Sequence, residues 1–403
     1  MSGRINTVVA LNIILVLALI SLMIIVHEFG HWIIARRLGF QTPVFGFGLP
    51  FGSHIKLGKW KNTEFRFHWF VLGGYVAIPE LGDETNEEIL KEMPGLKPLK
   101  SFPVWKRAAV ASAGVAFNIL FAYLACLIMV ATIGPPSDKG NVVITNLLDT
   151  PLGDTKPNPI AKQAGFQIGD VILQVNYLNI KDSSQVVKIV KSNPQKEIIF
   201  KVQRAFLSDG KKEQETLKIK VKPNKEGTIG IGLGVANNGE YDKPSRNPIV
   251  WILQAIEILT EWSINMLLGL WFMILNLVGM TPRGSPKIGA DDLHGIIAIV
   301  SVFAQAITLD FREVYKWSAL ISVNLAIVNL LPIPALDGGH LLFMFIEKIR
   351  GKRLAESVQQ KAIQTGFFLL ILLMFFVLFN DIKGLVSGKF NLLKERIHHV
   401  KKN

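Results

Sequence analysis

Cysteine is nearly absent from this chain of 403 residues, which contains one, Cys126. A single cysteine excludes an internal disulfide framework and any zinc site built from several cysteines. Charged residues are also scarce, at 19%, whereas hydrophobic residues make up 50% of the chain. This balance excludes a disordered chain, and it argues against a purely water-soluble protein because too few charges are available to face water.

The charges that are present are mostly basic. Lys and Arg number 44 against 31 Asp and Glu, which gives a formal net charge of +13. An excess of this kind fits either nucleic acid or the anionic surface of a membrane. The long apolar runs described next favour the membrane, and we expect no nucleic-acid partner.

Four apolar runs are of a length suited to crossing the hydrocarbon layer, and they cover residues 8–26, 108–133, 317–336 and 362–379. The first run is too long for the core of a signal peptide and lacks a small-residue cleavage site, so we expect an uncleaved helix. Residues 247–281 form a fifth run, which carries a polar stripe at helical spacing. This pattern predicts an amphipathic helix on the membrane surface, and a fifth crossing is the competing interpretation.

The distribution of basic residues predicts the orientation. Residues 36–107 contain eleven Lys and Arg, and a second basic cluster at 348–361 follows the third apolar run. Because cytoplasmic loops carry the excess of Lys and Arg, both loops should face the cytoplasm and both termini should face out. The basic tail at 394–402 is at odds with this orientation.

A water-soluble module is predicted between the second and fifth runs, over residues 140–235. Its pattern favours strands at 142–147, 170–176, 196–206 and 215–221, a helix at 183–191 and a hairpin turn at 208–210. We therefore divide the chain into an N-terminal membrane domain (1–136), this module (137–240), an amphipathic or membrane-surface helical region (241–315) and a C-terminal membrane domain (316–403).

The sequence His27-Glu28-Phe29-Gly30-His31 is an H-E-x-x-H motif at the end of the first apolar run. On a helix, positions i and i+4 share a face, so both imidazoles can bind one zinc ion, with the glutamate placed to deprotonate a bound water. Ionisable residues in such a helix are costly and usually functional. The competing interpretation is that the two histidines lie at the membrane interface without a metal.

A catalytic zinc needs a third protein ligand, and Asp337 is the best candidate. It follows a proline-broken stretch and precedes two glycines, Gly338 and Gly339, which allow close approach of the backbone. An aspartate there needs a strong electrostatic partner. A helix cap or a salt bridge to Lys348 is the alternative role for Asp337, and His340 is the alternative ligand.

Together, the H-E-x-x-H motif and the segment Asn-Leu-Leu-Pro-Ile-Pro-Ala-Leu-Asp-Gly-Gly-His at 329–340 resemble the site-2 protease family of intramembrane metalloproteases. The resemblance covers nearly the whole chain. It implies zinc held by His27, His31 and Asp337, with Glu28 as the general base. It also implies that Asn324 and Asn329 engage the substrate backbone; interhelical hydrogen bonding is their alternative role.

The same resemblance implies a fold: a polytopic α-helical membrane protein with about four transmembrane helices. Residues 46–79 resemble the family's membrane-associated β-hairpin, and residues 158–176 resemble the core of an extracytoplasmic PDZ-like α+β domain. The chain departs from the family by having one such module where close relatives carry two. It also departs at Gly114-Val115 and at 293–296, changes that we expect to affect packing more than zinc chemistry.

The predicted function is therefore that of an intramembrane zinc endopeptidase of the bacterial inner membrane. By resemblance, its substrates are transmembrane segments of single-span proteins, of the anti-sigma-factor or remnant-signal-peptide type. The alternative function is a non-enzymatic membrane scaffold that binds partners through its PDZ-like domain.

Overall fold

The computed structural model describes residues 2–71, 73–79, 102–136, 141–148, 158–208, 211–236, 241–280, 295–352 and 354–386. The chain divides into two compact units. The first comprises residues 1–131, 247–267 and 293–392, and the second comprises residues 132–246, 268–292 and 393–403. The predicted basic tail and the first two residues of the departure at 293–296 lie outside the described residues.

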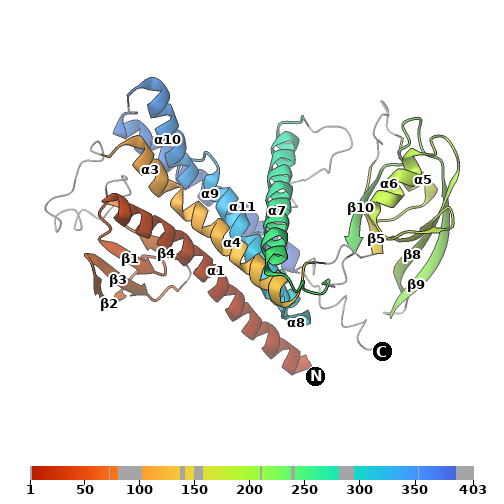
Figure 1. The fold of residues 1–403 in the computed structure, drawn as a ribbon, viewed down its shortest axis with the longest axis horizontal. Coiled ribbons are helices and arrows are strands. Elements are labelled where there is room, and N and C mark those ends of the chain that lie inside the picture. The colour runs from red at the N-terminus through yellow and green to blue at the C-terminus, as the bar shows by residue number, and fades with distance from the viewer. Residues whose placement is uncertain are drawn as a thin grey trace. The chain divides into compact units, whose positions relative to one another are not determined.

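The first unit is organised around helix α1 (Ser2–Leu38), which continues twelve residues beyond the predicted end of the first apolar run. The H-E-x-x-H motif therefore lies within a continuous helix, as predicted. Figure 1 shows α1 running beside α4 (Ala113–Thr132), with a small sheet against its C-terminal half. Glycine is needed where these helices meet, because a Cβ on Gly30 would lie 2.6 Å from the carbonyl oxygen of Ala113.

Among the described residues, four helices are long and apolar enough to cross a membrane: Ala10–Leu38, Val104–Thr132, Pro248–Asn276 and Ser357–Gly384. A multi-pass membrane protein with about four such helices is therefore confirmed, but the third predicted run is not among them. Most of that run lies in α9 (Glu313–Leu330), in which Glu313, Lys316 and two asparagines lower the mean hydropathy. Pro248–Asn276 takes its place, and none of its most apolar 18-residue window is buried in the protein. The run at 247–281 is therefore long and apolar enough for its competing interpretation, in which it crosses the membrane.

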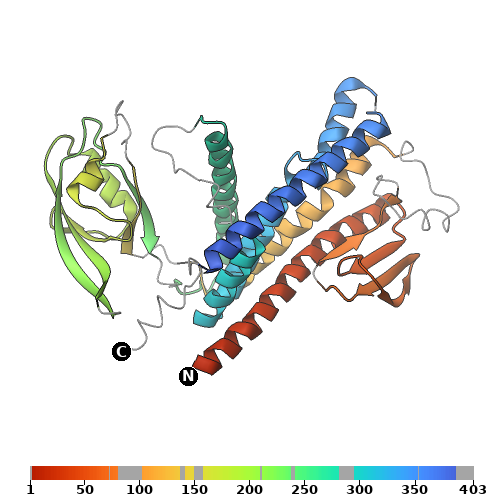
Figure 2. The same ribbon diagram turned by 180° about the vertical axis from the view of Figure 1, so that it is seen from behind.

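The remaining helices complete the bundle, and the view from behind shows α11 running along it next to α8 (Figure 2). Apolar side chains of α1 pack against α8 through Val16, Ile20 and Phe303. The bounds of these helices are α3 (Val104–Ala111), α7 (Pro248–Leu277), α8 (Ile296–Leu309), α10 (Asp337–Arg350) and α11 (Glu356–Val386).

A buried carboxylate from α11 caps the start of α8. Asp381 is fully buried and accepts hydrogen bonds from the backbone N–H groups of Gly295 (2.8 Å), Ile297 (3.1 Å) and Ala298 (3.1 Å). The first N–H groups of a helix have no partner within the helix, and the positive end of the helix dipole favours a negative charge. Asp381 therefore supplies a cap that the residues next to α8 do not.

The predicted β-hairpin is part of a four-stranded sheet in the order β2-β3-β1-β4. Strands β2 and β3 form the hairpin itself, and Lys61 and Asn62 at its turn both have positive φ, as a type I′ turn requires. β1 pairs in parallel with β3 and antiparallel with β4, so β4 is an edge strand. The strands are β1 (Val44–Phe47), β2 (His54–Trp60), β3 (Thr63–His68) and β4 (Gly74–Val76).

The second unit contains the predicted α+β module. Its antiparallel sheet has the order β10-β5-β6-β8-β9, with β7 paired to β6, and two short helices accompany it. The predicted strands, the helix at 183–191 and the pairing of the two long strands are confirmed; turn residues 209 and 210 lie outside the described part. The elements are β5 (Asn141–Leu147), α5 (Ile160–Ala164), β6 (Val171–Val175), β7 (Leu178–Asn179), α6 (Ser183–Lys191), β8 (Ile198–Ser208), β9 (Lys211–Val221) and β10 (Ile231–Ala236).

Candidate metal centre

Helix α1 brings the two histidines of the motif onto one face. His27 and His31 are each 7% exposed, and their Nε2 atoms lie 3.1 Å apart. This is the geometry expected of positions i and i+4 on a helix. The polar faces of both rings are thus directed into the protein rather than toward lipid.

Asp337 reaches the same point from the other end of the chain. Helix α9 ends at Leu330, before Pro332 and Pro334, and Asp337 is the first residue of α10. The glycines that follow were expected to allow close approach to the metal. Instead they allow the preceding loop to approach α10, since a Cβ on Gly339 would lie 2.5 Å from the carbonyl oxygen of Ile333. The loop backbone therefore packs closely on the first turn of α10, which fixes the position of Asp337.

The three side chains form a compact donor set. Oδ2 of Asp337 lies 3.0 Å from Nε2 of His27 and 3.2 Å from Nε2 of His31. Ligand atoms about 2.0–2.1 Å from a tetrahedral zinc ion lie about 3.3 Å from one another, so the observed spacing fits one ion with little adjustment. Two imidazoles and a carboxylate are also a ligand set typical of catalytic zinc, which keeps the fourth position open. Within the described residues, this is the group of His, Cys, Asp or Glu side chains that could hold a metal ion.

The hydrogen bond at Nδ1 of His31 also fits a metal ion at Nε2. Nδ1 of His31 lies 2.8 Å from the carbonyl oxygen of Val110, which can only accept, so Nδ1 carries the proton. In the neutral ring, Nε2 then presents a lone pair toward the carboxylate oxygen of Asp337. Two acceptors 3.2 Å apart need a proton or a cation between them, and a divalent cation bound at this point would satisfy both.

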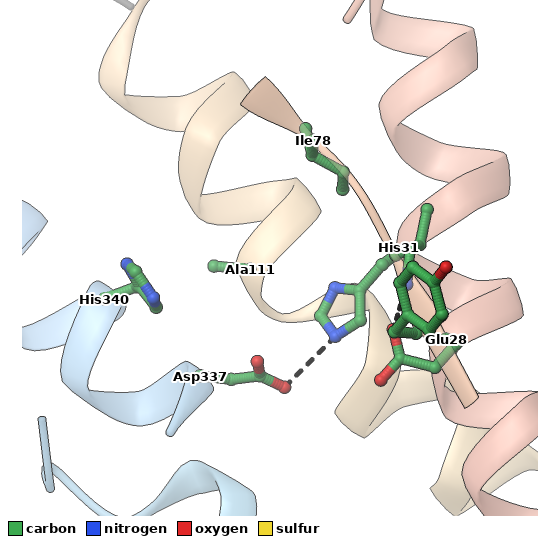
Figure 3. A pocket seen from close by; sticks show the side chains of 8 residues that line it. Glu28, His31, Ile78, Ala111, Asp337 and His340 are labelled. Atoms are coloured by element: carbon green, nitrogen blue, oxygen red, sulfur yellow. Dashed lines mark hydrogen bonds and ion pairs between the residues drawn. The ribbon is translucent and has the colours of Figure 1, made fainter. Parts of the chain in front are cut away.

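Glu28 and two of the candidate ligands, His31 and Asp337, line a common cavity of about 230 Å³. Figure 3 shows the carboxylate of Asp337 directed toward the ring of His31, with the side chain of Glu28 next to His31. Oε2 of Glu28 accepts a hydrogen bond from the backbone N–H of Val76 on β4, at 3.1 Å. A volume of this size admits several water molecules or a peptide group, so water can reach the glutamate and the donor set.

The edge strand beside the cavity is held by a pair of ring side chains. The hydroxyl of Tyr75 lies 3.1 Å from Nε2 of His68, and the Tyr75 ring covers Gly46 on β1, where a side chain would collide with it. Burial raises the pKa of Tyr75 and lowers the pKa of His68. Both groups are therefore neutral near pH 7, and their contact is a hydrogen bond rather than an ion pair.

Three other predicted candidates are not part of this donor set. His340 lines the cavity, but its ring lies apart from the His31–Asp337 pair, so it is not a substitute ligand (Figure 3). Asn324 is exposed on α9 and Asn329 is half-buried, and neither lines the cavity. A spacing of five residues places them about 140° apart around the helix, so they do not share one face.

The helix that carries Asp337 is tied to α3 by a buried ion pair that the sequence did not reveal. Arg107, which was counted among the basic residues of a predicted cytoplasmic loop, is 4% exposed and makes two hydrogen bonds to Glu347 on α10, of 2.9 and 2.7 Å. Replacing Arg107 with Met would leave the Glu347 carboxylate without this partner. We expect the free energy of unfolding to fall by about 3 kcal/mol, because the mostly buried Glu347 carboxylate loses both hydrogen bonds from Arg107. Thermal unfolding of the purified protein in detergent measures it.

An exposed pair provides the control for this prediction. Arg312 is bound to Asp310 at 2.6 Å but is 52% exposed, so Arg312→Met should lower stability by less than about 1 kcal/mol. Equal melting temperatures for Arg107→Met and Arg312→Met would show that the buried pair does not stabilise the position of α10.

A histidine pair, an aspartate and a cavity-lining glutamate in this arrangement are characteristic of metallopeptidases, and the apolar helices place the site in a membrane protein. Comparison with known proteins agrees. The model of "Peptidase family M50" matches residues 15–373. The chain therefore belongs to peptidase family M50, the site-2 proteases, and it is a zinc metalloprotease.

Individual relatives match over most of their length. A protein of Nostoc sp. that is named as a zinc metalloprotease is 32% identical over 94% of this chain and 97% of its own. A similarly named protein of Synechocystis sp. is 32% identical over 91% of this chain and 93% of its own. The membrane metalloprotease ARASP, chloroplastic, of Arabidopsis thaliana is 30% identical over 91% of this chain and 77% of its own.

Proposed function

We propose that this protein is an intramembrane endopeptidase in which His27, His31 and Asp337 hold the catalytic zinc and Glu28 is the general base. The observation that carries this proposal is the convergence of three donor atoms, 3.0–3.2 Å apart, from helices separated by about 300 residues. The converging residues come from the two motifs that the sequence singles out.

The chemistry follows from the positions of the side chains. Zinc, when bound, acidifies a water molecule and polarises the carbonyl of the scissile peptide bond. Glu28 lines the cavity next to the donor set, so its carboxylate can accept the proton of the attacking water. The same carboxyl group then returns that proton to the nitrogen of the leaving amine. Apolar helices around the site limit the access of bulk water to the cavity.

A helical substrate must be unwound before its peptide bonds can be attacked, since its carbonyls are engaged in hydrogen bonds. Strand β4 offers a place for the unwound segment. One edge of β4 pairs with β1, and its Val76 N–H points away from that pairing toward Glu28. We infer that an extended substrate segment adds to this edge by β-augmentation, which would bring its backbone to the cavity. Asn324 and Asn329 are proposed to engage the substrate further along α9.

The sheet is proposed to associate with the membrane. Gly48 and Leu49 hydrogen-bond to Gly73 and Phe70, so the loops at this end of the sheet lie side by side. Large apolar side chains are exposed there and require a lipid or protein surface to cover them. These side chains are Phe51, Trp69, Phe70 and Val71.

The proposed substrates are transmembrane segments of single-span proteins, of the anti-sigma-factor or remnant-signal-peptide type, cut near their cytoplasmic end. The proposed location is the bacterial inner membrane, with the module predicted at 137–240 outside the cytoplasm. We interpret this module as PDZ-like, because a Gly-Asp pair (Gly169, Asp170) leads into β6 as it does in a PDZ core. Its proposed role is to exclude substrates with bulky outer domains.

Metal analysis tests the proposed site directly. The purified protein should contain about one zinc per chain, and a chelator should remove both the zinc and the cleavage of a model transmembrane substrate. Asp337→Ala should lower the zinc content and abolish cleavage, because one of three protein ligands is lost. His340→Ala is the matched control on the same helix turn and should keep its zinc. Full zinc occupancy in Asp337→Ala would refute the proposed ligand set.

A further inference from the structure

One face of the α3–α4 segment lies directly against the two histidines. Val110, Gly114 and Asn118 follow one another at intervals of four residues, and all three are buried. Each of them meets one of the imidazoles or both. Figure 3 shows the helix that carries Ala111 passing beside the ring of His31. This face therefore lies directly against the two histidines of the donor set.

The roles of Val110 and Gly114 follow from their backbones. The carbonyl of Val110 fixes the tautomer of His31, as described above. A Cβ on Gly114 would lie 2.6 Å from Nε2 of His27 and closer still to Nε2 of His31, so only glycine leaves room for both rings. Val110 thus provides a partner for Nδ1 of His31. Nδ1 of His27 needs a partner of its own.

Asn118 lies next to this nitrogen, but the amide group is placed with its NH₂ toward the ring, whereas a metal-bound histidine needs an acceptor there. The side chain is fully buried, and Nδ2 lies 3.2 Å from Nδ1 of His27, whereas Oδ1 is buried without a hydrogen-bond partner. When Nε2 of a neutral imidazole is a ligand, Nδ1 must carry the proton and can only donate. Rotating the amide by 180° would place Oδ1 on this proton and remove the unsatisfied oxygen.

We infer that Asn118 is a positioning residue of the metal centre, whose Oδ1 accepts the Nδ1 proton of His27 and thereby directs Nε2 toward the metal. The inference rests on the metal site proposed above. Partners of this kind fix the tautomer and orientation of ligating histidines, and their removal typically lowers metal affinity 10- to 100-fold. The hydroxyl of Ser322 donates to the backbone carbonyl of Asn118 at 2.8 Å, which ties this turn of α4 to α9.

The competing role for Asn118 is that of an ordinary hydrogen bond between membrane helices. Asn12 exemplifies that role: its Nδ2 donates to the hydroxyl of Thr308 on α8 at 2.8 Å. Asn12 belongs to the same long helix as the histidines but lies about four turns from them. Asn12→Leu is therefore a matched control, because it removes an interhelical amide without touching a ligand.

Zinc affinity of the purified full-length protein, measured by competition with a chromophoric chelator, tests the inference. Asn118→Leu should bind zinc 10- to 100-fold more weakly than the unmodified protein, and Asn12→Leu should bind it within threefold. Asn118→Asp, which can only accept, should also stay within threefold of the unmodified protein. Zinc binding does not depend on cleavage, so the readout is separate from activity.

The outcomes are distinguishable. Unchanged zinc affinity in Asn118→Leu would overturn the inference while leaving the metal site intact. If Asn118→Leu does not fold, Asn118→Asp alone decides: a large loss of zinc from a folded Asn118→Asp would mean that the donor end of the amide faces His27. Retention of zinc by Asp337→Ala would instead refute the site itself.

Discussion

Replacing Glu28 with Gln should leave the zinc content unchanged and lower the cleavage rate of a transmembrane substrate by about 10²- to 10⁴-fold. The amide of Gln has nearly the shape of the carboxylate, and its oxygen can still accept the N–H of Val76. It cannot take a proton from water. The rate of product formation by the purified protein in detergent, together with zinc per chain, measures both expectations.

Glu257→Gln is the control for this substitution. Glu257 is exposed on α7 and is not among the residues that line the cavity, so its amide variant should cleave at the unmodified rate. Wild-type cleavage by Glu28→Gln would reject Glu28 as the general base, and loss of zinc from this variant would assign the carboxylate a structural role instead.

Gly114→Ala should lose most of its zinc and its proteolytic activity although it changes one hydrogen to a methyl group. The new Cβ would lie 2.6 Å from Nε2 of His27, closer than such atoms approach in proteins, and the ring of His31 blocks the other direction. The imidazoles or α4 would have to move, and a displacement of about 1 Å at a catalytic centre can cost about 10²-fold in rate. Zinc affinity and cleavage rate are the measurements.

A second glycine in an apolar helix controls for the general effect of adding a methyl group. Gly269 on α7 has no atom within 4 Å of the position that a Cβ would take. Gly269→Ala should therefore retain zinc and activity, and the higher helix propensity of alanine favours its stability. Equal zinc affinities for Gly114→Ala and Gly269→Ala would mean that the contact between α4 and the histidines is not tight.

The metal centre could be predicted from sequence because its residues belong to short motifs with fixed spacing. His27 and His31 share a helix face by periodicity, and the prolines before Asp337 predicted a break between α9 and the residues that follow it. The departure at Gly114-Val115 was expected to concern packing. The structure shows that Gly114 itself lies against both imidazoles, so packing and metal geometry are inseparable there.

Other features depend on contacts between distant segments, for which the sequence has no local signal. Asn118 and His27 are 91 residues apart, and nothing in the apolar run around Asn118 indicates its partner. The same holds for the ion pair of Arg107 with Glu347 and for the pairing of β1 with β3, which extended a predicted hairpin into a four-stranded sheet. Tertiary structure, rather than periodicity, determines these neighbours.

The carboxylate that caps α8 has a consequence for biogenesis. Three backbone N–H groups at the start of α8 donate to Asp381, which is translated more than eighty residues later. Until the ribosome has delivered α11, this end of α8 has unsatisfied donors in apolar surroundings, where each is costly. Assembly of the bundle around α1 is thus completed only when α11, the last described helix, docks, so a competent protease cannot form before α11 has been synthesised.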